Sequence, residues 1–427
     1  MAAPHTPEPA PEDATDALVD GDRILARGTA QAALSHRDFR IVWGGTFASN
    51  IGTWMQNVLL GAYGYTLTRS ETYVGLLFFA QLGPLLFLSN IGGVLADVLD
   101  RRRLLLAMQV QQLFFSIVLA VIVTSDEPSR VVLFLCVLVI GIGNALGAPA
   151  LSAILPTLVP KPDLPGAVSL QSVQMNLSRV IGPAIGAAIY TTAGVAPVFA
   201  LNALTYGFAI AALLVVSYPR HPVAHTDDSV IRRLGEGFRI ARADPVVRRV
   251  LIILFTMSFF SLVFVGQMPS IAETNFDIRT KSVEYGVLYA VFGLGAAFGA
   301  VSVGTWFAAF PKERLIRPAF LAFAALLGGF AVIRVSWAAF IVAPLLGYAY
   351  FVVITSLSTV LQSHIDDAVR GRVVALWIMG FGGTVPLGVL VFGVVAHATS
   401  ISLVLLMGAA VAVLLAIYAD LPATRRS

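Results

Sequence analysis

Charged side chains are scarce in this sequence of 427 residues. Only 12% of the residues are Asp, Glu, Lys or Arg, whereas about 25% is usual for a soluble domain. Apolar residues make up 57% of the chain, and the mean hydropathy is +0.83. A chain with so few charges has too little polar surface to cover itself in water. The composition therefore excludes a soluble enzyme and indicates a membrane protein.

Cysteine is nearly absent as well. Cys136 is the single cysteine, so no disulfide within the chain and no cysteine-based metal site can form. The sequence also has no Walker-type phosphate loop, which argues against an ATP-driven pump. We therefore expect no enzymatic activity, no cofactor, no metal and no nucleic-acid partner.

Long apolar runs are what the sequence has in abundance. Continuous apolarity of this length predicts membrane-spanning helices, because the strands of a membrane barrel alternate at every second residue. We predict an all-α membrane protein with twelve transmembrane helices. The runs lie at about 41–67, 73–97, 104–124, 131–155, 167–192, 195–217, 249–272, 284–309, 317–334, 337–361, 372–396 and 399–419.

The positions of the basic residues predict the orientation. When the spans alternate across the membrane, 22 of the 28 Lys and Arg residues fall on the side that holds both termini, and five fall on the other side. Loops rich in Lys and Arg stay in the cytoplasm. We therefore expect both termini in the cytoplasm. The remaining cation, Arg179, lies within a span.

The longest internal connection divides the chain into two halves. We expect a disordered acidic cytoplasmic tail over 1–36, six helices over 37–217, a cytoplasmic linker over 218–248, six helices over 249–420 and a short cytoplasmic tail over 421–427. Apolar residues recur at helical spacing within the linker, with arginines between them, which predicts a short amphipathic helix on the membrane surface. These apolar residues are Ile231, Leu234, Phe238 and Ala241.

The two halves also echo one another. Gly166 opens the fifth span and Gly371 opens the eleventh, at an offset of 205 residues, and each span then contains a Pro and a Gly. Two six-helix pseudo-repeats with a binding site between them are the arrangement expected of a secondary transporter.

The segment after the second span carries the clearest motif. It reads Gly92-Gly93-Val94-Leu95-Ala96-Asp97-Val98-Leu99-Asp100-Arg101-Arg102-Arg103-Leu104. In its glycines, its aspartate and its arginines it resembles the loop between helices two and three of the major facilitator superfamily. Val98 and Asp100 depart from the general pattern, which has Arg and Gly there. Asp100 before the arginines is similar to the branch of macrolide and enterobactin exporters, the transmembrane secretion effector type.

Three further stretches resemble that branch: 37–56 around the first helix, Leu177–Gly186 in the fifth and Arg370–Val373 at the eleventh. The resemblance implies a monomeric secondary active efflux transporter of the bacterial inner membrane. Such a protein exports lipophilic or amphiphilic molecules, such as drugs, macrolides or siderophores, by alternating access coupled to protons. A facilitator or importer of a small organic solute with the same fold is the alternative. A third alternative is a membrane sensor that no longer transports.

The motif suggests a conformational latch. In one interpretation Asp97 pairs locally with Arg101 or Arg102 and merely anchors the helix end. In the other, which the resemblance implies, Asp97 faces the positive N-terminus of the eleventh helix near Gly371 and Arg372 and holds the two halves together. Gly93 would permit the close approach of helices that such a latch needs.

Polar residues within the spans are the candidates for a substrate cavity. Arg179 lies on one face of the fifth helix with Asn176, and a charge at this depth is a functional candidate by default. The alternatives are snorkelling to the outer surface or a structural bond to Asn144 or to a helix carbonyl. If Arg179 faces the cavity, an anionic or acceptor-rich solute would suit it. The other predicted lining residues are Asn50, Thr53, Asn57, Gln267, Tyr348 and Thr355.

Titratable carboxylates are missing from the middle of every span. Proton exchange ordinarily needs such a group, and Glu273, at the end of the seventh helix, is the nearest candidate. Gly182, Pro183 and Gly186 resemble the core of the antiporter signature in helix five, although the glycines that usually precede it are absent.

Overall fold

The computed structural model describes residues 28–216, 218, 230–365 and 367–420. Within these ranges it leaves out the side chains of Asn90, Asp97, residues 230–234, Glu236, residues 367–371 and Ala375.

The first half contains six long helices. They are α3 (Arg37–Thr68), α4 (Glu71–Val98), α5 (Arg101–Ile122), α6 (Arg130–Ile154), α7 (Leu164–Ala193) and α8 (Ala196–Val215). A short helix, α2 (Ala30–Ser35), precedes α3, and two 3₁₀ turns, η1 (Leu155–Leu158) and η2 (Lys161–Asp163), join α6 to α7. Each of the six long helices is long enough to span a bilayer.

The second half repeats this plan with two interrupted spans. After α9 (Val230–Ala243), the seventh span consists of α10 (Pro245–Thr256), the π-turn η3 (Met257–Ser261), α11 (Val263–Gly266) and α12 (Met268–Phe276). Continuous spans follow as α13 (Val283–Gly304), α14 (Lys312–Val332) and α15 (Ser336–His364). The eleventh span is α16 (Asp367–Ile378), the π-turn η4 (Met379–Gly383) and α17 (Thr384–Ala398), and α18 (Ile401–Tyr418) is the last.

The prediction of an all-α membrane protein with twelve spans is confirmed. Among the described residues, nine helices are long and apolar enough to cross a membrane. The three other predicted spans are α3, the polar α7 and the interrupted seventh span. Side-chain caps mark several helix starts where the sequence supplies Ser or Asp, because these side chains accept the unpaired backbone N–H groups of the first turn. These caps are Ser70, Asp100, Ser129, Asp244, Ser282 and Ser400.

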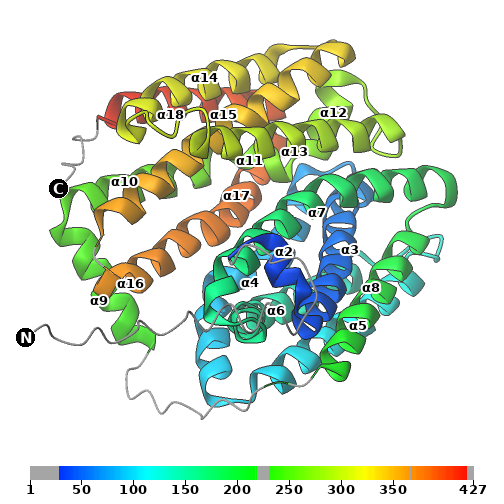
Figure 1. Cartoon of the computed structure of the whole chain (residues 1–427). Coiled ribbons are helices and arrows are strands. Elements are labelled where there is room, and N and C mark those ends of the chain that lie inside the picture. The colour runs from blue at the N-terminus through cyan, green and yellow to red at the C-terminus, as the bar shows by residue number, and fades with distance from the viewer. Residues whose placement is uncertain (1–27, 217, 219–229, 366, 421–427) are drawn as a thin grey trace, which may run out of the picture.

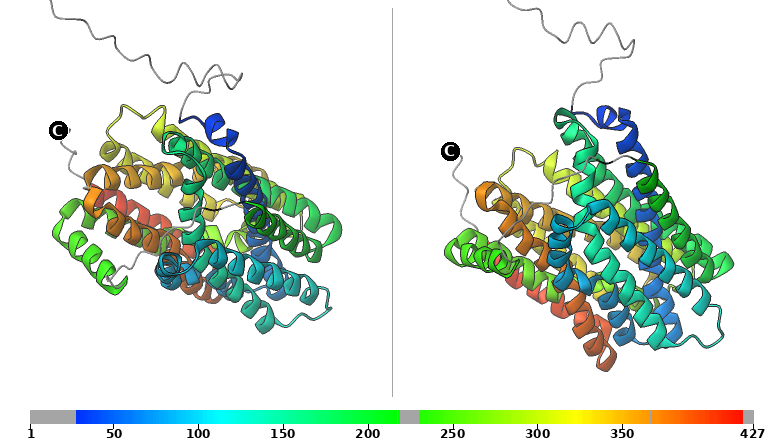
Figure 2. Two further views of the ribbon diagram at one scale, coloured as in Figure 1. Left: turned by 60° about the horizontal axis from the view of Figure 1, so that its bottom comes forward. Right: turned by 90° about the horizontal axis from the view of Figure 1, so that it is seen from below.

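Both halves use the same packing scheme. In the first half α4 packs on α6, and α5 packs on α6 and α8; in the second half α13 packs on α15, and α14 packs on α15 and α18. The halves meet through two equivalent seams, α4 with α17 and α7 with α13 (Figures 1 and 2). This is the arrangement of two six-helix pseudo-repeats.

Two ends of the molecule need names. The linker end holds the start of α3, the end of α4 and the linker helix α9, and the Glu71 end holds the start of α4 and the ends of α12 and α17. Gly393 lies against the Glu71 carbonyl at the Glu71 end, whereas Gly383 meets Leu86 near the middle of α4. The seam between α4 and α17 therefore runs from the Glu71 end to mid-depth.

The order of the chain before α3 differs from the sequence expectation of a disordered tail over 1–36. Residues 1–27 lie outside the described residues, but Ala30–Ser35 form α2, which Thr29 caps. Ala32 and Ala33 are buried, and α2 packs against α7. The two alanines supply a contact surface for α7, which the acidic composition of the segment did not predict. The linker helix α9 plays the equivalent part in the second half, because it packs against α16.

Candidate functional site

Arg179 lies at the middle of α7, where the two halves meet. Its guanidinium carbon is 5.0 Å from the centre of the Trp54 ring on α3 and 5.7 Å from that of Phe351 on α15. The neutral phenols of Tyr289 and Tyr350 are the titratable groups near it. Arg179 therefore joins aromatic rings of both halves through cation–π contacts, which are worth up to about 2 kcal/mol each when desolvated.

The charge of Arg179 is not neutralised by a neighbour in the described part of the chain, where no ion pair involves it. Among the described residues its buried Nε has no hydrogen-bond partner, and the side chain as a whole is half-buried. A half-buried cation that contacts rings and no described carboxylate keeps its full charge, so the site is electropositive. An anion or an oxygen-rich group is the natural partner of such a guanidinium.

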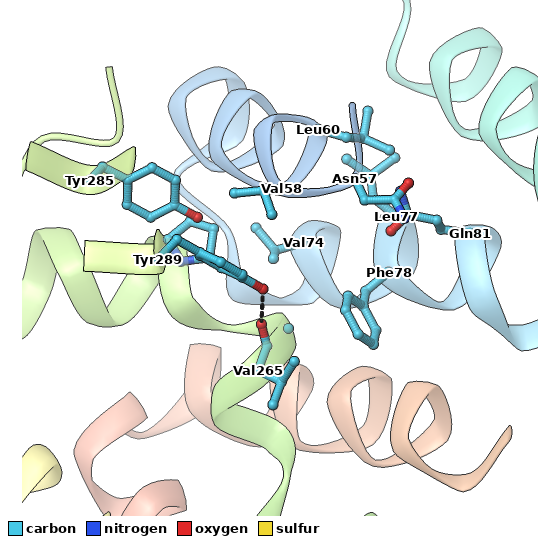
Figure 3. Close-up of a pocket in the computed structure, with 13 residues that line it drawn as sticks. Asn57, Val58, Leu60, Val74, Leu77, Phe78, Gln81, Val265, Tyr285 and Tyr289 are labelled. Carbon is cyan, nitrogen blue, oxygen red and sulfur yellow. Dashed lines mark hydrogen bonds between the residues drawn. The ribbon is translucent and has the colours of Figure 1, made fainter. Parts of the chain in front are cut away.

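A small pocket lies beside this cluster, between α3 and α4 of the first half and the α11–α13 segment of the second (Figure 3). Most of its lining is apolar, and its polar members are Asn57, Gln81, Tyr285 and Tyr289. Gln81 Nε2 donates to Asn57 Oδ1 at 2.5 Å. Trp54, over which Arg179 lies, is one helical turn before Val58 of the pocket lining, so the charge adjoins the pocket.

Tyr285 supplies an unused polar group to this pocket. The residue is 0% exposed, and its hydroxyl has no hydrogen-bond partner among the described residues. Figure 3 shows its ring directed toward the pocket. A buried hydroxyl without a partner is unfavourable by about 1–3 kcal/mol, so a ligand that offers an acceptor or donor here would be stabilised.

The break in the seventh span shapes the same pocket. Pro269 has no N–H, and it therefore cannot donate to the carbonyl of Val265, four residues earlier. Tyr289 Oη donates to that carbonyl instead, at 3.2 Å (Figure 3). A side chain of α13 thus satisfies the backbone where the span is interrupted, as is typical of broken helices in transporters.

The Glu71 end of the molecule is tied shut by polar contacts between the halves. Arg69, which follows α3, pairs with the carboxylate of Glu273 on α12. Thr66 Oγ1 lies 2.9 Å from Thr280 Oγ1, and Thr280 Oγ1 donates to Glu273 Oε1 at 2.5 Å. Glu273, the predicted proton site, is therefore part of a contact between the ends of α3 and α12.

Glu71 makes a second connection at this end, and its side chain bonds to residues of the other half. Oε1 accepts from Ser270 Oγ at 2.9 Å, and Oε2 lies 3.0 Å from His397 Nδ1. The Glu71 carbonyl accepts from Gln267 Nε2 at 2.9 Å. The start of α4 is thus held by α12 and α17 together.

The predicted cavity residues separate into several groups. Asn57 lines the pocket and Arg179 adjoins it. Thr53 instead pairs with Tyr206 of α8 at 3.3 Å, away from the seam, and Gln267 is fully buried in the closed end. Asn176 donates to the Ser172 carbonyl of its own helix. The remaining predicted residues are half-buried and outside the pocket lining: Asn50, Asn144, Tyr348 and Thr355.

The predicted latch falls partly outside the described residues. The side chain of Asp97 and the surroundings of Gly371 are not described, so their approach stays a prediction. Arg101 donates to the Ala96 carbonyl at 3.1 Å, and Arg372 is half-buried near the start of the eleventh span. A Cβ at Gly93 would meet no atom of the described residues within 4 Å.

Arg102 has a defined structural position. Its Nε and Nη2 donate to the carbonyls of Leu213 and Leu214, each at 2.9 Å, and its guanidinium lies over the Tyr218 ring. It therefore caps the last turn of α8, where unpaired carbonyls favour a cation.

The helix-five motif lies against the first helix. A Cβ at Gly182 would sit 2.7 Å from the Ile51 carbonyl, and one at Gly186 would sit 2.9 Å from Leu59. Pro183 is buried in the same face of α7. The two glycines allow α7 and α3 to approach closely, and this places Arg179 beside Trp54.

Several site residues were not found from the sequence. Trp54, Phe351 and Tyr289 surround Arg179, and Tyr285 and Gln81 line the pocket. Aromatic residues within apolar runs gave no signal of their own. Gln81, a polar residue inside the second span, was the one local sign.

Comparison with known proteins agrees with this architecture. A family model described as the transmembrane secretion effector matches residues 28–425. The chain belongs to this family, a branch of the major facilitator superfamily. Relatives similar to this chain include the enterobactin exporter EntS of Escherichia coli O1:K1. It is 28% identical over 351 residues, which are 80% of this chain and 81% of the relative. EntS of Shigella boydii serotype 18 is 29% identical with the same coverage.

Solved structures of similar fold are also transporters. A mutant of the nucleoside transporter NupG superposes with a TM-score of 0.74 at 12% identity, covering 90% of this chain and 99% of that one. A bacterial homolog of the lysosomal transporter Spinster, in an inward-facing and unoccupied conformation, gives 0.71 at 15% identity, covering 90% and 95%. At these identities the similarity establishes the fold alone. Together with the family match, it makes this chain a multi-pass membrane transporter of the efflux type rather than an enzyme.

Proposed function

We propose that this transporter exports an anionic or acceptor-rich aromatic small molecule across the bacterial inner membrane. The observation that carries the proposal is Arg179, a half-buried guanidinium without a counterion in the described residues, held between rings of both halves and beside a pocket. Rings and a cation together suit a flat ligand with carboxylate or catecholate oxygens. The relatives named as enterobactin exporters support a siderophore-like substrate.

Alternating access is the mechanism we propose. The polar contacts of Arg69, Glu71 and Glu273 hold the Glu71 end shut, and the substrate path would therefore open first toward the linker end. The distribution of Lys and Arg supports a cytoplasmic position for the linker end and both termini. The substrate would enter from the cytoplasm, and a rocking of the halves would break the closed end and release it outside.

Proton coupling is the finer part of this proposal, with Glu273 as its site. In the closed state its carboxylate pairs with Arg69 and accepts from Thr280. Uptake of a proton from outside would remove the charge that Arg69 binds, so protonation would weaken this contact between the halves. A facilitator with the same architecture is the second candidate, supported by the nucleoside transporter among the structures of similar fold.

Inverted membrane vesicles test the direction and the coupling. We expect vesicles that contain the protein to take up 2,3-dihydroxybenzoate or enterobactin, and an uncoupler to abolish accumulation. Equilibration that resists the uncoupler would favour the facilitator. Absence of flux for both compounds would contradict the proposed substrate class.

A reversible crosslink tests alternating access. Thr66 and Thr280 face each other across the halves at 2.9 Å, and Cys136 is the single native cysteine. In a C136A background, T66C/T280C should form a disulfide that stops transport, and a reductant should restore it. The single variant T66C is the control. Full transport by the oxidised double variant would exclude opening at this end.

A further inference from the structure

We propose that export is electrogenic: the substrate crosses as an anion bound at Arg179, and the inside-negative membrane potential drives it outward. This inference rests on the proposed function and adds its driving force. It concerns the charge that moves, whereas the proton site at Glu273 concerns the contact that opens.

The first step is the depth of Arg179. It occupies the middle of α7, and the rings that contact it come from the middle of α3 and of α15. A Cβ at Gly293 of α13 would lie 3.5 Å from the Arg179 carbonyl, so the residue sits on the seam between the halves. A ligand held here is roughly half-way through the hydrocarbon layer, in either orientation of the transporter.

The second step is the charge balance of the site. The Arg179 guanidinium makes two cation–π contacts, its Nε has no hydrogen-bond partner, and no carboxylate pairs with it among the described residues. The described carboxylates and imidazoles around the seam lie at its two ends. Glu71, Glu273 and His397 are at the Glu71 end, and His36, Asp163 and Asp244 are at the linker end.

The third step follows from electrostatics in a low-dielectric medium. An unpaired cation at this depth is costly, and an anion that binds beside it relieves that cost. The site therefore selects the ionised form of an acidic substrate over its neutral form. Among the described residues no carboxylic acid or imidazole adjoins the guanidinium to donate a proton to such an anion, because its titratable neighbours there are the hydroxyls of Tyr289 and Tyr350. The substrate accordingly keeps its charge while it crosses.

The consequence is a measurable driving force. A potential of 100 mV acting on one elementary charge is worth about 2.3 kcal/mol, which corresponds to roughly a 50-fold concentration ratio. The potential of a living cell is negative inside and therefore drives an anion outward. Exchange for a proton would add a second charge and raise the ratio further, whereas transport of a neutral substrate without proton exchange would leave the ratio at one.

Reconstituted liposomes test the inference with the full chain. Valinomycin and a potassium gradient set an inside-positive potential of 100 mV at equal buffered pH, and 2,3-dihydroxybenzoate, which is anionic through its carboxylate, is the probe. We expect accumulation to approach 50-fold or more, whichever way the protein is inserted. Saturable equilibration to a ratio of one would overturn the inference and leave the proposed function intact. Absence of protein-dependent flux at any potential would overturn both.

Variants of Arg179 test its part in this selection. The rates for 2,3-dihydroxybenzoate and for neutral catechol are compared in the same liposomes. In R179Q we expect the ratio of anion rate to neutral rate to fall at least tenfold, and R179K should restore most of it. The control is R317Q, which removes an exposed cation near the start of α14. An equal loss of both rates in R179Q would assign Arg179 a structural role and contradict the inference.

Discussion

His36 Nε2 lies 2.8 Å from Asp163 Oδ2, and the second half repeats this pairing with the two residue types exchanged. His36 precedes α3 and Asp163 ends the connection from α6 to α7. In the second half Asp244 precedes α10, and its Oδ2 lies 3.0 Å from Nε2 of His364 at the end of α15. Each half thus ties the start of its first span to the connection before its fifth span. The internal repeat extends to single contacts.

The second of these pairs predicts a pH-dependent contribution to stability. Partial burial alone would raise the pKa of Asp244, but the N–H of Val247, the His364 side chain and the N–H of Val246 bond its carboxylate and lower the pKa. Because its pKa is lowered, the ionised Asp244 carboxylate contributes stability at pH values above its ordinary pKa of 3.8. This contribution is lost as the pH falls through the lowered pKa. We expect D244N to cost under about 1 kcal/mol at pH 7, because Asn still caps α10.

Thermal unfolding in detergent between pH 7 and pH 3 measures this effect. The difference in Tm between the wild type and D244N should be constant down to about pH 5 and shrink as the pH falls below about 4. D38N, which changes a carboxylate near the start of α3, is the matched control. A difference that grows toward low pH would contradict the sign.

Gly286 predicts how tightly the two halves must close. A Cβ at Gly286 would overlap the Cβ of Ala187 across the seam between α13 and α7. We expect G286A to lower the rate of transport severalfold, because the helices would have to separate. The double variant G286A/A187G removes the opposing atom and should recover most of the rate. G304A, whose Cβ would meet nothing within 4 Å, is the control. Failure of A187G to rescue would place the defect elsewhere.

The spans could be predicted from the sequence because an apolar run of about 20 residues matches the thickness of the hydrocarbon layer. The predicted run 249–272 nonetheless hides a π-turn at Met257–Ser261 and a break at Gln267. All these segments are apolar, so hydropathy does not register a change of backbone path. The contact between Glu71 and His397 could not be predicted for another reason. They are 326 residues apart and each lies at a loop boundary, so their contact depends on how the halves dock.

Arg102 offers a test of two roles for the arginine motif. As a cap it bonds the carbonyls of Leu213 and Leu214, and R102A should then lower the free energy of unfolding by about 1–2 kcal/mol. As a latch residue it would change transport without changing stability. Thermal unfolding and transport measured on the same preparation separate these roles, and R103A, an exposed neighbour, is the control. Loss of transport at unchanged Tm would favour the latch.

Pro269 and Tyr289 predict a compensating pair. Tyr289 Oη donates to the Val265 carbonyl, which Pro269 leaves without its helical N–H donor. Y289F should therefore cost about 1–3 kcal/mol, because a buried carbonyl loses its partner. P269A restores an N–H at that position, so the cost of Y289F should be smaller in the P269A background. Unfolding free energies of the four combinations give the coupling energy directly.

The same double-mutant cycle reveals whether the break serves transport. If the interrupted span is needed to shape the pocket, P269A/Y289F should recover stability but transport slowly, since a continuous helix would shift Val265 and Gly266 in the pocket wall. Y285F, which removes a hydroxyl without a protein partner from the same pocket, should leave stability unchanged or raise it. Additive unfolding free energies in the cycle would show that Tyr289 does not compensate for Pro269. The Tyr289 hydroxyl would then act only on the ligand.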